Sequence, residues 1–155
     1  MTRATADRVG LAVFLASWAM LVAALGFAAL ALRPTSLATP ALIAMVSISE
    51  LAAISCVAAA AVSTFVLLGW TRLAVASAFV FAGIQVALIG SAILGGSSQG
   101  AHLLLLVGSF HALNVAVALC GFLGQLYRRR SLGLWGTFWH ALAIAWLFFS
   151  GVLFL

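Results

Sequence analysis

The chain has 155 residues, of which 66% are hydrophobic and 6% charged, with seven basic residues, all arginine, against two acids. A mean hydropathy of +1.31 excludes an ordinary soluble domain. The net charge of +5 does not indicate nucleic acid as a partner. The arginines stand at the ends of long apolar runs, where membrane topology accounts for them.

Five apolar runs fill nearly the whole sequence, at residues 9–32, 41–68, 73–94, 101–127 and 134–155. Each reaches the roughly 20 residues that a helix needs to cross a bilayer. Lipid offers the backbone no hydrogen-bond partners, so every run is predicted to be a helix. The first run is too long for the core of a cleaved signal peptide, so we expect it to be retained. The sequence therefore predicts an all-α polytopic membrane protein, with one domain over residues 1–155 formed by a bundle of five transmembrane helices.

The arginines are distributed unequally between the two sides of the predicted bundle. Arg33 falls on one side. The other six fall on the side of the N-terminus, at Arg3, Arg8, Arg72, Arg128, Arg129 and Arg130. Cytoplasmic loops of membrane proteins carry the excess of arginine and lysine. We therefore expect a cytoplasmic N-terminus and a periplasmic C-terminus in a bacterial cytoplasmic (inner) membrane.

Small residues recur every four positions in three of the runs, a spacing that lets membrane helices approach closely. They are Ala52, Cys56, Ala60 and Thr64 in the second run, Ala74, Ala78 and Ala82 in the third, and Gly108, Ala112, Ala116, Cys120 and Gly124 in the fourth. These stripes predict the faces on which the helices pack.

Four polar side chains fall at similar depths within the predicted spans. Glu50 lies ten residues past Pro40, and so about 15 Å deep at about 1.5 Å per residue. A charge at that depth is costly unless it is paired or protonated. Gln85, His111 and Asn114 lie at comparable depths in their own spans. We expect these four to form one hydrogen-bonded cluster, which either clasps the helices together or binds a proton, a lipid headgroup or a ligand.

The histidines are poorly placed to hold a haem within one chain. His111 lies roughly 24 Å above the arginine-rich end of its span and His140 roughly 9 Å, so they cannot ligate one haem from opposite faces. The sequence has no Ser-His-Asp set, no paired carboxylates and no metal-binding histidine spacing. The chain therefore lacks the groups needed for catalysis by itself. We expect no haem, metal or other cofactor in this chain.

Four segments, taken in chain order, carry a resemblance to a known family. They are GLAVFLASWAMLVAALGFAALALR from Gly10 to Arg33, FVFAGIQV at 79–86, GSFHALNV at 108–115, and FWHALAIAWLFFSGVLFL from Phe138. Together they resemble subunit III of the haem-copper oxidases in its short five-helix form. They are also similar to the related accessory subunit found with some nitric oxide reductases.

The family pattern carries over at Ser17, Arg33, Gln85, His111, Trp139, His140 and Trp146. The chain departs from it at three positions. The buried glutamate of the family's FLASE motif falls at Trp18, the second histidine of its GFHGLHV motif at Asn114, and the aspartate of its WHFVD motif at Ala143. Without that glutamate, the resemblance does not extend to a role in proton uptake.

The resemblance implies a non-catalytic subunit of a respiratory electron-transport complex. Such a subunit carries no haem or copper, packs beside and protects a catalytic subunit that holds the haem and the copper or iron, and holds phospholipid. The candidate structural, lipid-contact or partner-contact residues are Glu50, Gln85, His111, Asn114, Trp139, His140, Trp146 and Arg33. We expect leucine at His111 or Glu50 to loosen the assembly more than it abolishes the chemistry.

Two other functions remain open from the sequence. One is a free-standing five-helix membrane protein of the tryptophan-rich sensory type, which binds a small ligand. The other is a small carrier, which is disfavoured because no internal repeat or broken helix is visible.

Overall fold

The computed structural model describes residues 3–31, 48–94, 99–129 and 132–154, and the regular structure within these ranges is α-helical. The helices are α1 (Arg3–Ala31), α2 (Ile48–Leu67), α3 (Thr71–Leu94), α4 (Gln99–Tyr127) and α5 (Gly133–Phe154). Each of the five is long and apolar enough to cross a membrane. The prediction of an all-α multi-pass membrane protein with five helices is confirmed, although α1 begins well before the expected start at residue 9.

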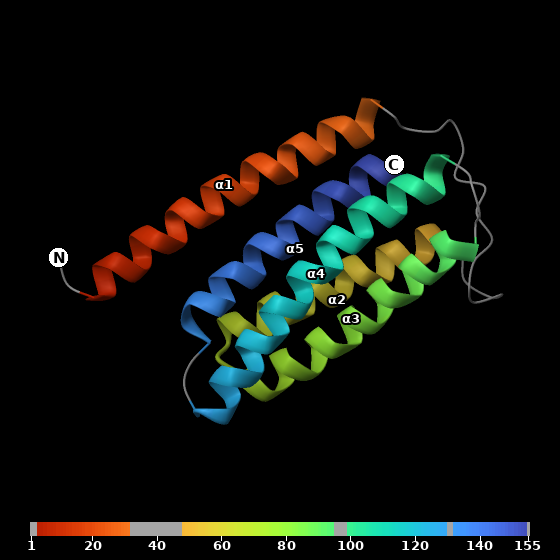
Figure 1. Cartoon of the computed structure of the whole chain (residues 1–155). Coiled ribbons are helices and arrows are strands. Elements are labelled where there is room, and N and C mark those ends of the chain that lie inside the picture. Colours follow the sequence, from red (N-terminus) through yellow and green to blue (C-terminus); the bar gives the residue numbers. More distant parts are fainter. Residues whose placement is uncertain (1–2, 32–47, 95–98, 130–131, 155) are drawn as a thin grey trace.

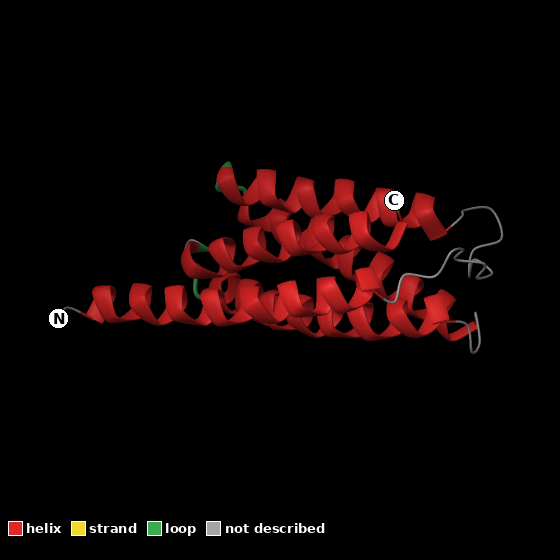
Figure 2. Cartoon of the chain, turned by 90° about the horizontal axis from the view of Figure 1, so that it is seen from above, coloured by secondary structure: helices red, strands yellow, loops and turns green. Residues whose placement is uncertain are grey.

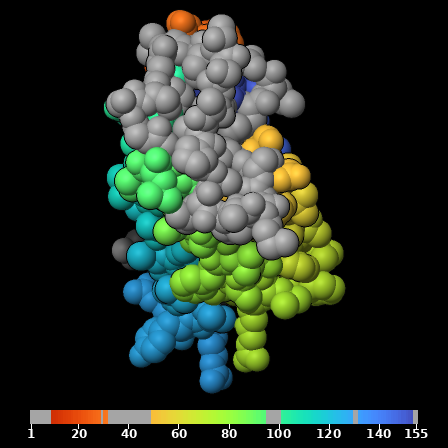
Figure 3. Space-filling model, turned by 90° about the vertical axis from the view of Figure 1, so that its right-hand side faces the viewer, coloured from red at the N-terminus to blue at the C-terminus, as the bar shows by residue number. Residues whose placement is uncertain are grey.

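Helices α2 to α5 form a closed ring of four. α2 packs on α3, α3 on α4, α4 on α5, and α5 on α2. Successive helices run in opposite directions, so the ring is an up-down-up-down bundle (Figures 1 and 2). The α2–α3 and α4–α5 connections and the start of α1 lie at one end of this bundle, which we call the arginine-rich end for Arg72, Arg128 and Arg129. The C-terminus lies at the opposite end, which faces the viewer in Figure 3.

Helix α1 lies outside the ring and packs mainly along α5, parallel to it (Figure 1). Phe138 of α5 makes edge-on contacts with Phe14 and Trp18 of α1, with ring centroids 5.7 and 6.2 Å apart. In the most apolar window of α1, 17% of the residues are buried in the protein, against 50% in that of α5. α5 is therefore the central helix, and most of the surface of α1 is left for lipid or another protein.

The turn from α2 to α3 depends on Gly69, whose φ of 72° suits a residue without a Cβ. The amide of Gly69 donates to the carbonyl oxygen of Val66 at 3.1 Å, and the amide of Trp70 to that of Phe65 at 2.9 Å. These bonds satisfy carbonyls that the end of a helix leaves free. The rings of Phe65 and Trp70 stack 5.9 Å apart across the turn. α2 and α3 are thereby joined as a tight antiparallel pair.

The predicted stripes of small residues are correct in α3 and only partly correct elsewhere. Ala74 and Ala78 of α3 are fully buried. In α4, Gly108 is buried but Ala116 and Cys120 are exposed, and the exposed members in α2 are Ala60 and Thr64. Four residues turn through about 400° at about 3.6 residues per turn, so the stripe drifts about 40° at each step. Over a long helix this drift carries the stripe off the buried face.

Candidate functional site

An aromatic layer lies at the centre of the ring. The buried ring of His111 in α4 lies 4.9 Å from the ring of Trp146 in α5 and 5.9 Å from that of Phe81 in α3. Phe81 also makes edge-on contacts with Trp139 and Trp146, at 5.6 and 6.3 Å. Such pairs stabilise a core by about 0.5–1.5 kcal/mol each beyond the burial of their surface. These four side chains, the aromatic layer, join three helices of the ring.

Two indole groups connect the aromatic layer to the fourth helix of the ring, α2. The Nε1–H of Trp146 donates to Oγ of Ser55 at 2.7 Å. The hydroxyl of Ser55 in turn donates to the carbonyl oxygen of Ala52 at 2.6 Å. The Nε1–H of Trp139 donates to the carbonyl oxygen of Ala59 across a longer 3.5 Å. Buried indoles need such partners, so these bonds determine how α5 faces α2.

Sequence reasoning did not single out Ser55. A lone serine in an apolar helix commonly bonds back to its own helix, so its presence alone gave no signal of a contact with α5. The serine does bond back, to Ala52, and its oxygen accepts from Trp146 at the same time. Only the packing of α5 on α2 reveals the second role.

Gln85 and His111 are buried without hydrogen bonds. Gln85 is 1% exposed and His111 0%. Neither the amide atoms of Gln85 nor the ring nitrogens of His111 have a hydrogen-bond partner among the described residues. Ile89 of α3 lies against Gly108 of α4, so the antiparallel register brings Gln85 to the level of His111. Each unpaired buried polar group costs about 1–3 kcal/mol. These two side chains therefore do not form the hydrogen-bonded cluster that the sequence predicted.

Glu50 lies away from the aromatic layer. It stands in the first turn of α2 with an exposed side chain. It precedes Ser55 by five residues, and so lies about 7.5 Å farther toward the opposite end. The sequence-based depth counted helix from Pro40, whereas the described helix begins at Ile48. Glu50 is thus not the buried acid that we expected. An acid at this position is favoured by the helix dipole.

Asn114 contacts α1 instead of the other polar residues of the layer. Its Oδ1 accepts a hydrogen bond from Nε1 of Trp18 at 3.2 Å. Its Nδ2 donates to the carbonyl oxygen of Phe110, one turn earlier in α4, at 2.8 Å. Asn114 is therefore a structural contact between α1 and the ring.

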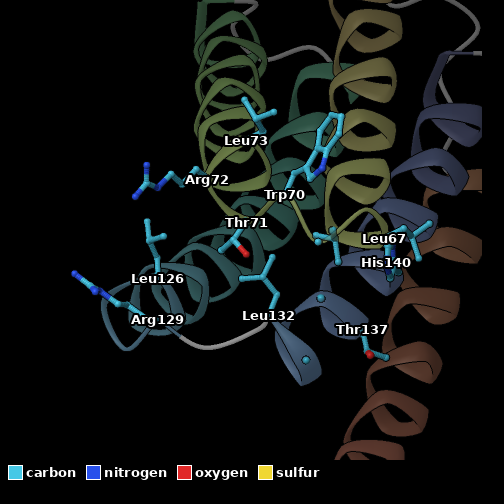
Figure 4. A pocket seen from close by; sticks show the side chains of 14 residues that line it. Leu67, Trp70, Thr71, Arg72, Leu73, Leu126, Arg129, Leu132, Thr137 and His140 are labelled. Atoms are coloured by element: carbon cyan, nitrogen blue, oxygen red, sulfur yellow. The ribbon is translucent and has the colours of Figure 1, made fainter.

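A pocket of about 1350 Å³ opens at the arginine-rich end, between the α2–α3 connection, the end of α4 and the start of α5 (Figure 4). His140 lines it, together with Trp70, Arg72, Arg129 and Thr137. His140 was predicted to be a contact residue, and this pocket is where it lies. Arg33, predicted on the same grounds, falls outside the described residues.

Two smaller grooves have volumes of about 470 Å³ each. One, between α1 and α5, is lined by apolar and small residues that include Leu15, Trp18 and Phe148. The other lies along α4, where Ala116, Cys120 and Gly124 line it, and is bounded by Trp135 of α5. Both are the kind of surface that an acyl chain or a neighbouring helix can fill.

No group of three or more histidine, cysteine, aspartate or glutamate side chains that could hold a metal comes together within the described residues. Trp139 and Trp146 of the aromatic layer are seven residues apart in α5, or about 10.5 Å of helix, and His140 directly follows Trp139. His140 belongs to the pocket at the arginine-rich end and His111 to the aromatic layer. The two histidines thus serve different parts of the molecule.

Comparison with known proteins finds no protein-family model that matches this chain and no match among curated proteins.

Proposed function

We propose that this chain is a non-catalytic, subunit III-like component of a respiratory haem-copper oxidase or nitric oxide reductase complex. In this role it packs against the catalytic subunit, stabilises it and holds phospholipid. The haem and the copper or iron belong to that partner.

The proposal is supported mainly by the positions, in the structure, of the residues that carry the resemblance. Gln85, His111, Trp139 and Trp146 come from three separate motif segments, and each is at most 1% exposed. Phe81 contacts the other three rings of the aromatic layer. The register of α3 and α4 brings Gln85 to the level of His111. Of the other two residues of the resemblance that the structure describes, His140 is half-buried and Ser17 is exposed. The proposal is supported by the burial of four of these six positions together in the core of the ring.

The exposed half of the small-residue stripe on α4 supports docking against another subunit. Ala116, Cys120 and Gly124 are exposed. A Cβ added at Gly124 would meet no atom of the chain within 4 Å. Small residues on a lipid-facing surface let a foreign helix approach closely, so this face is suited to a partner. The groove between α1 and α5 is suited to an acyl chain, because its lining is almost wholly apolar.

The proposed orientation has a cytoplasmic N-terminus and a periplasmic C-terminus in a bacterial cytoplasmic membrane. It is supported by the gathering of Arg72, Arg128 and Arg129 at the end of the bundle where α1 begins (Figure 1). Lysine and arginine are enriched in cytoplasmic loops.

A second candidate function is a free-standing five-helix membrane protein that binds a small ligand. The pocket at the arginine-rich end favours it, because about 1350 Å³ would accommodate a drug-sized molecule.

Purification separates the two functions. The chain is tagged at one terminus, extracted from its native membrane in mild detergent and examined by size exclusion and by reduced-minus-oxidised absorption spectra. The proposal predicts haem bands and a large co-purifying membrane polypeptide in constant ratio to this chain. A parallel purification of an unrelated tagged multi-pass protein from the same membranes must lack those bands. A colourless, monodisperse homo-oligomer would overturn the proposal and support the second function.

A further inference from the structure

The pocket at the arginine-rich end has cations on its rim. Arg72 at the start of α3 and Arg129 just after α4 extend from the same side of it (Figure 4). Side chains from these two segments also project beyond the rest of the molecule in Figure 3. No acidic side chain is present among the described residues that line the pocket. Two cations on one rim repel each other, so an anion between them is stabilised by both.

Arg129 occupies a backbone conformation that favours glycine. Its φ is 51°, and its amide donates to the carbonyl oxygen of Leu126 at 3.1 Å. The same turn ends α2, and there Gly69 takes the left-handed position. An L-residue in this conformation is strained, and strain retained at an exposed turn points to a role for the side chain. The turn directs the Arg129 side chain to the rim of the pocket.

Apolar side chains form another part of the wall of the pocket. Leu67, Leu126 and Leu132 line the pocket (Figure 4). Trp70, which also lines it, and Tyr127 nearby in α4 are 53% and 91% exposed. Exposed Trp and Tyr at the end of a membrane bundle mark the level of the lipid headgroups. A free phosphate ion would use the cations and leave the apolar wall unused, whereas a lipid uses both.

We propose that this pocket binds an anionic phospholipid, with its phosphate between the guanidinium groups of Arg72 and Arg129 and the upper part of its acyl chains against the leucines. Basic pockets between membrane helices are suited to such headgroups. The inference deepens the lipid-holding part of the proposed function and rests on it for its setting. All the residues involved belong to this chain, so lipid binding and assembly with a haem protein can fail separately.

Native mass spectrometry of the full-length chain tests the site. The protein is purified in mild detergent and titrated with phosphatidylglycerol or with phosphatidylcholine of the same acyl chains. We expect tighter binding of phosphatidylglycerol, weakened about fivefold by Arg72→Gln and by Arg129→Gln. Arg128→Gln is the matched control for this pocket, because it removes the same charge one residue away and Arg128 lines the separate groove along α4 instead.

Arg129→Gly is a second variant, which distinguishes loss of lipid binding from loss of folding. Glycine relieves the strained φ, so this variant should lose the preference for phosphatidylglycerol while melting no lower than the unaltered chain. Equal binding of the two lipids by the unaltered chain would overturn the proposal. An equal loss in Arg128→Gln would do so too, because the preference for phosphatidylglycerol would then not belong to this pocket. Full displacement of phosphatidylglycerol by excess inorganic phosphate would overturn the assignment to a lipid. None of these outcomes depends on the haem spectrum that tests the proposed function.

Discussion

The indole Nε1–H of Trp18 donates a hydrogen bond of 3.2 Å to Oδ1 of Asn114, across 96 residues of sequence. These are two of the three positions at which the chain departs from the subunit III pattern, where the family has a glutamate and a histidine. The departures therefore meet each other in space. The pair makes a polar contact between α1 and α4 with two neutral groups, which avoids the cost of an ionised side chain within the membrane. A change at one of these two positions is therefore expected to affect the other.

A double-mutant cycle measures this contact. Trp18→Phe removes the donor and keeps the ring that packs on Phe138, and Asn114→Ala removes the acceptor. We expect the double variant to lose less free energy of unfolding than the two single variants lose in sum. The difference, the coupling energy, should be about 0.6 kcal/mol and at most about 1.7 kcal/mol. Unfolding in mixed micelles of increasing SDS content, followed by tryptophan fluorescence, gives the free energies.

The control for this cycle pairs Trp18→Phe with Thr64→Val. Thr64 is exposed on α2 and its hydroxyl bonds only within its own helix in the hydrogen bonds described, to the carbonyl oxygen of Ala60 at 3.0 Å. These two changes should be additive, because α1 packs mainly on α5. Additivity in the Trp18–Asn114 cycle as well would show that the hydrogen bond contributes nothing.

Two glycines of α1 should respond in opposite directions to alanine. A Cβ at Gly26 would collide with the ring of Phe148 in α5, whereas a Cβ at Gly10 would meet nothing within 4 Å. Gly10→Ala should raise stability by up to about 1 kcal/mol through helix propensity. Gly26→Ala should be less stable than Gly10→Ala by about 1–3 kcal/mol, because the ring must move and α1 loses its close approach to α5. The same SDS titration checks both, and equal effects would mean that α1 does not dock on α5 at Gly26.

Helix number and approximate bounds could be predicted from the sequence, because each run of apolar residues is long enough to cross a bilayer. The rotation of each helix about its own axis could not. A helix that is apolar all round has no polar face to show which side is buried. The bond between Trp18 and Asn114 and the bond between Trp146 and Ser55 both depend on that rotation. The depth of Glu50 was also misjudged, because Glu50 lies five residues before Ser55, the residue of α2 that contacts the aromatic layer.

The bond between Ser55 and Trp146 makes a clear prediction for stability. Ser55→Ala leaves the Nε1–H of Trp146 buried without an acceptor, at a cost of about 1–3 kcal/mol. Adding Trp146→Phe removes the orphaned donor, so the double variant should lose less than the two single changes summed. Ser150→Ala is a suitable control, because Ser150 is a buried serine of α5 whose Oγ has no hydrogen-bond partner among the described residues. If Ser55→Ala lowers the stability no more than that control does, the hydrogen bond from Trp146 to Ser55 does not contribute to stability.

His111→Leu should leave the stability of the chain unchanged or slightly raised. Its ring nitrogens have no hydrogen-bond partner among the described residues, so an apolar side chain of similar size removes two costly polar atoms, which offsets the loss of the ring contacts with Phe81 and Trp146. His111→Ala should lower the stability of the chain by about 2–5 kcal/mol, because the smaller side chain leaves a cavity in the aromatic layer. This reverses the sequence-based reason for expecting leucine to loosen the assembly, which assumed that His111 clasps helices by hydrogen bonds. A marked loss of stability in His111→Leu would show that the histidine has a polar partner in the membrane.

The exposed stripe on α4 allows docking of a partner to be tested without disturbing the chain itself. A side chain at Gly124 or at Gly83 of α3 would meet no atom of the chain within 4 Å of its Cβ, and both positions are exposed. Gly124→Leu should not lower the stability of the isolated chain. It should lower co-purification of the proposed haem-bearing partner at least tenfold, because a bulky side chain keeps the foreign helix away from Ala116 and Cys120. Gly83→Leu carries the same added bulk on another helix and should leave co-purification intact. The ratio of haem to tagged chain is the readout, and full retention of haem in Gly124→Leu would mean that the partner does not contact this face of α4.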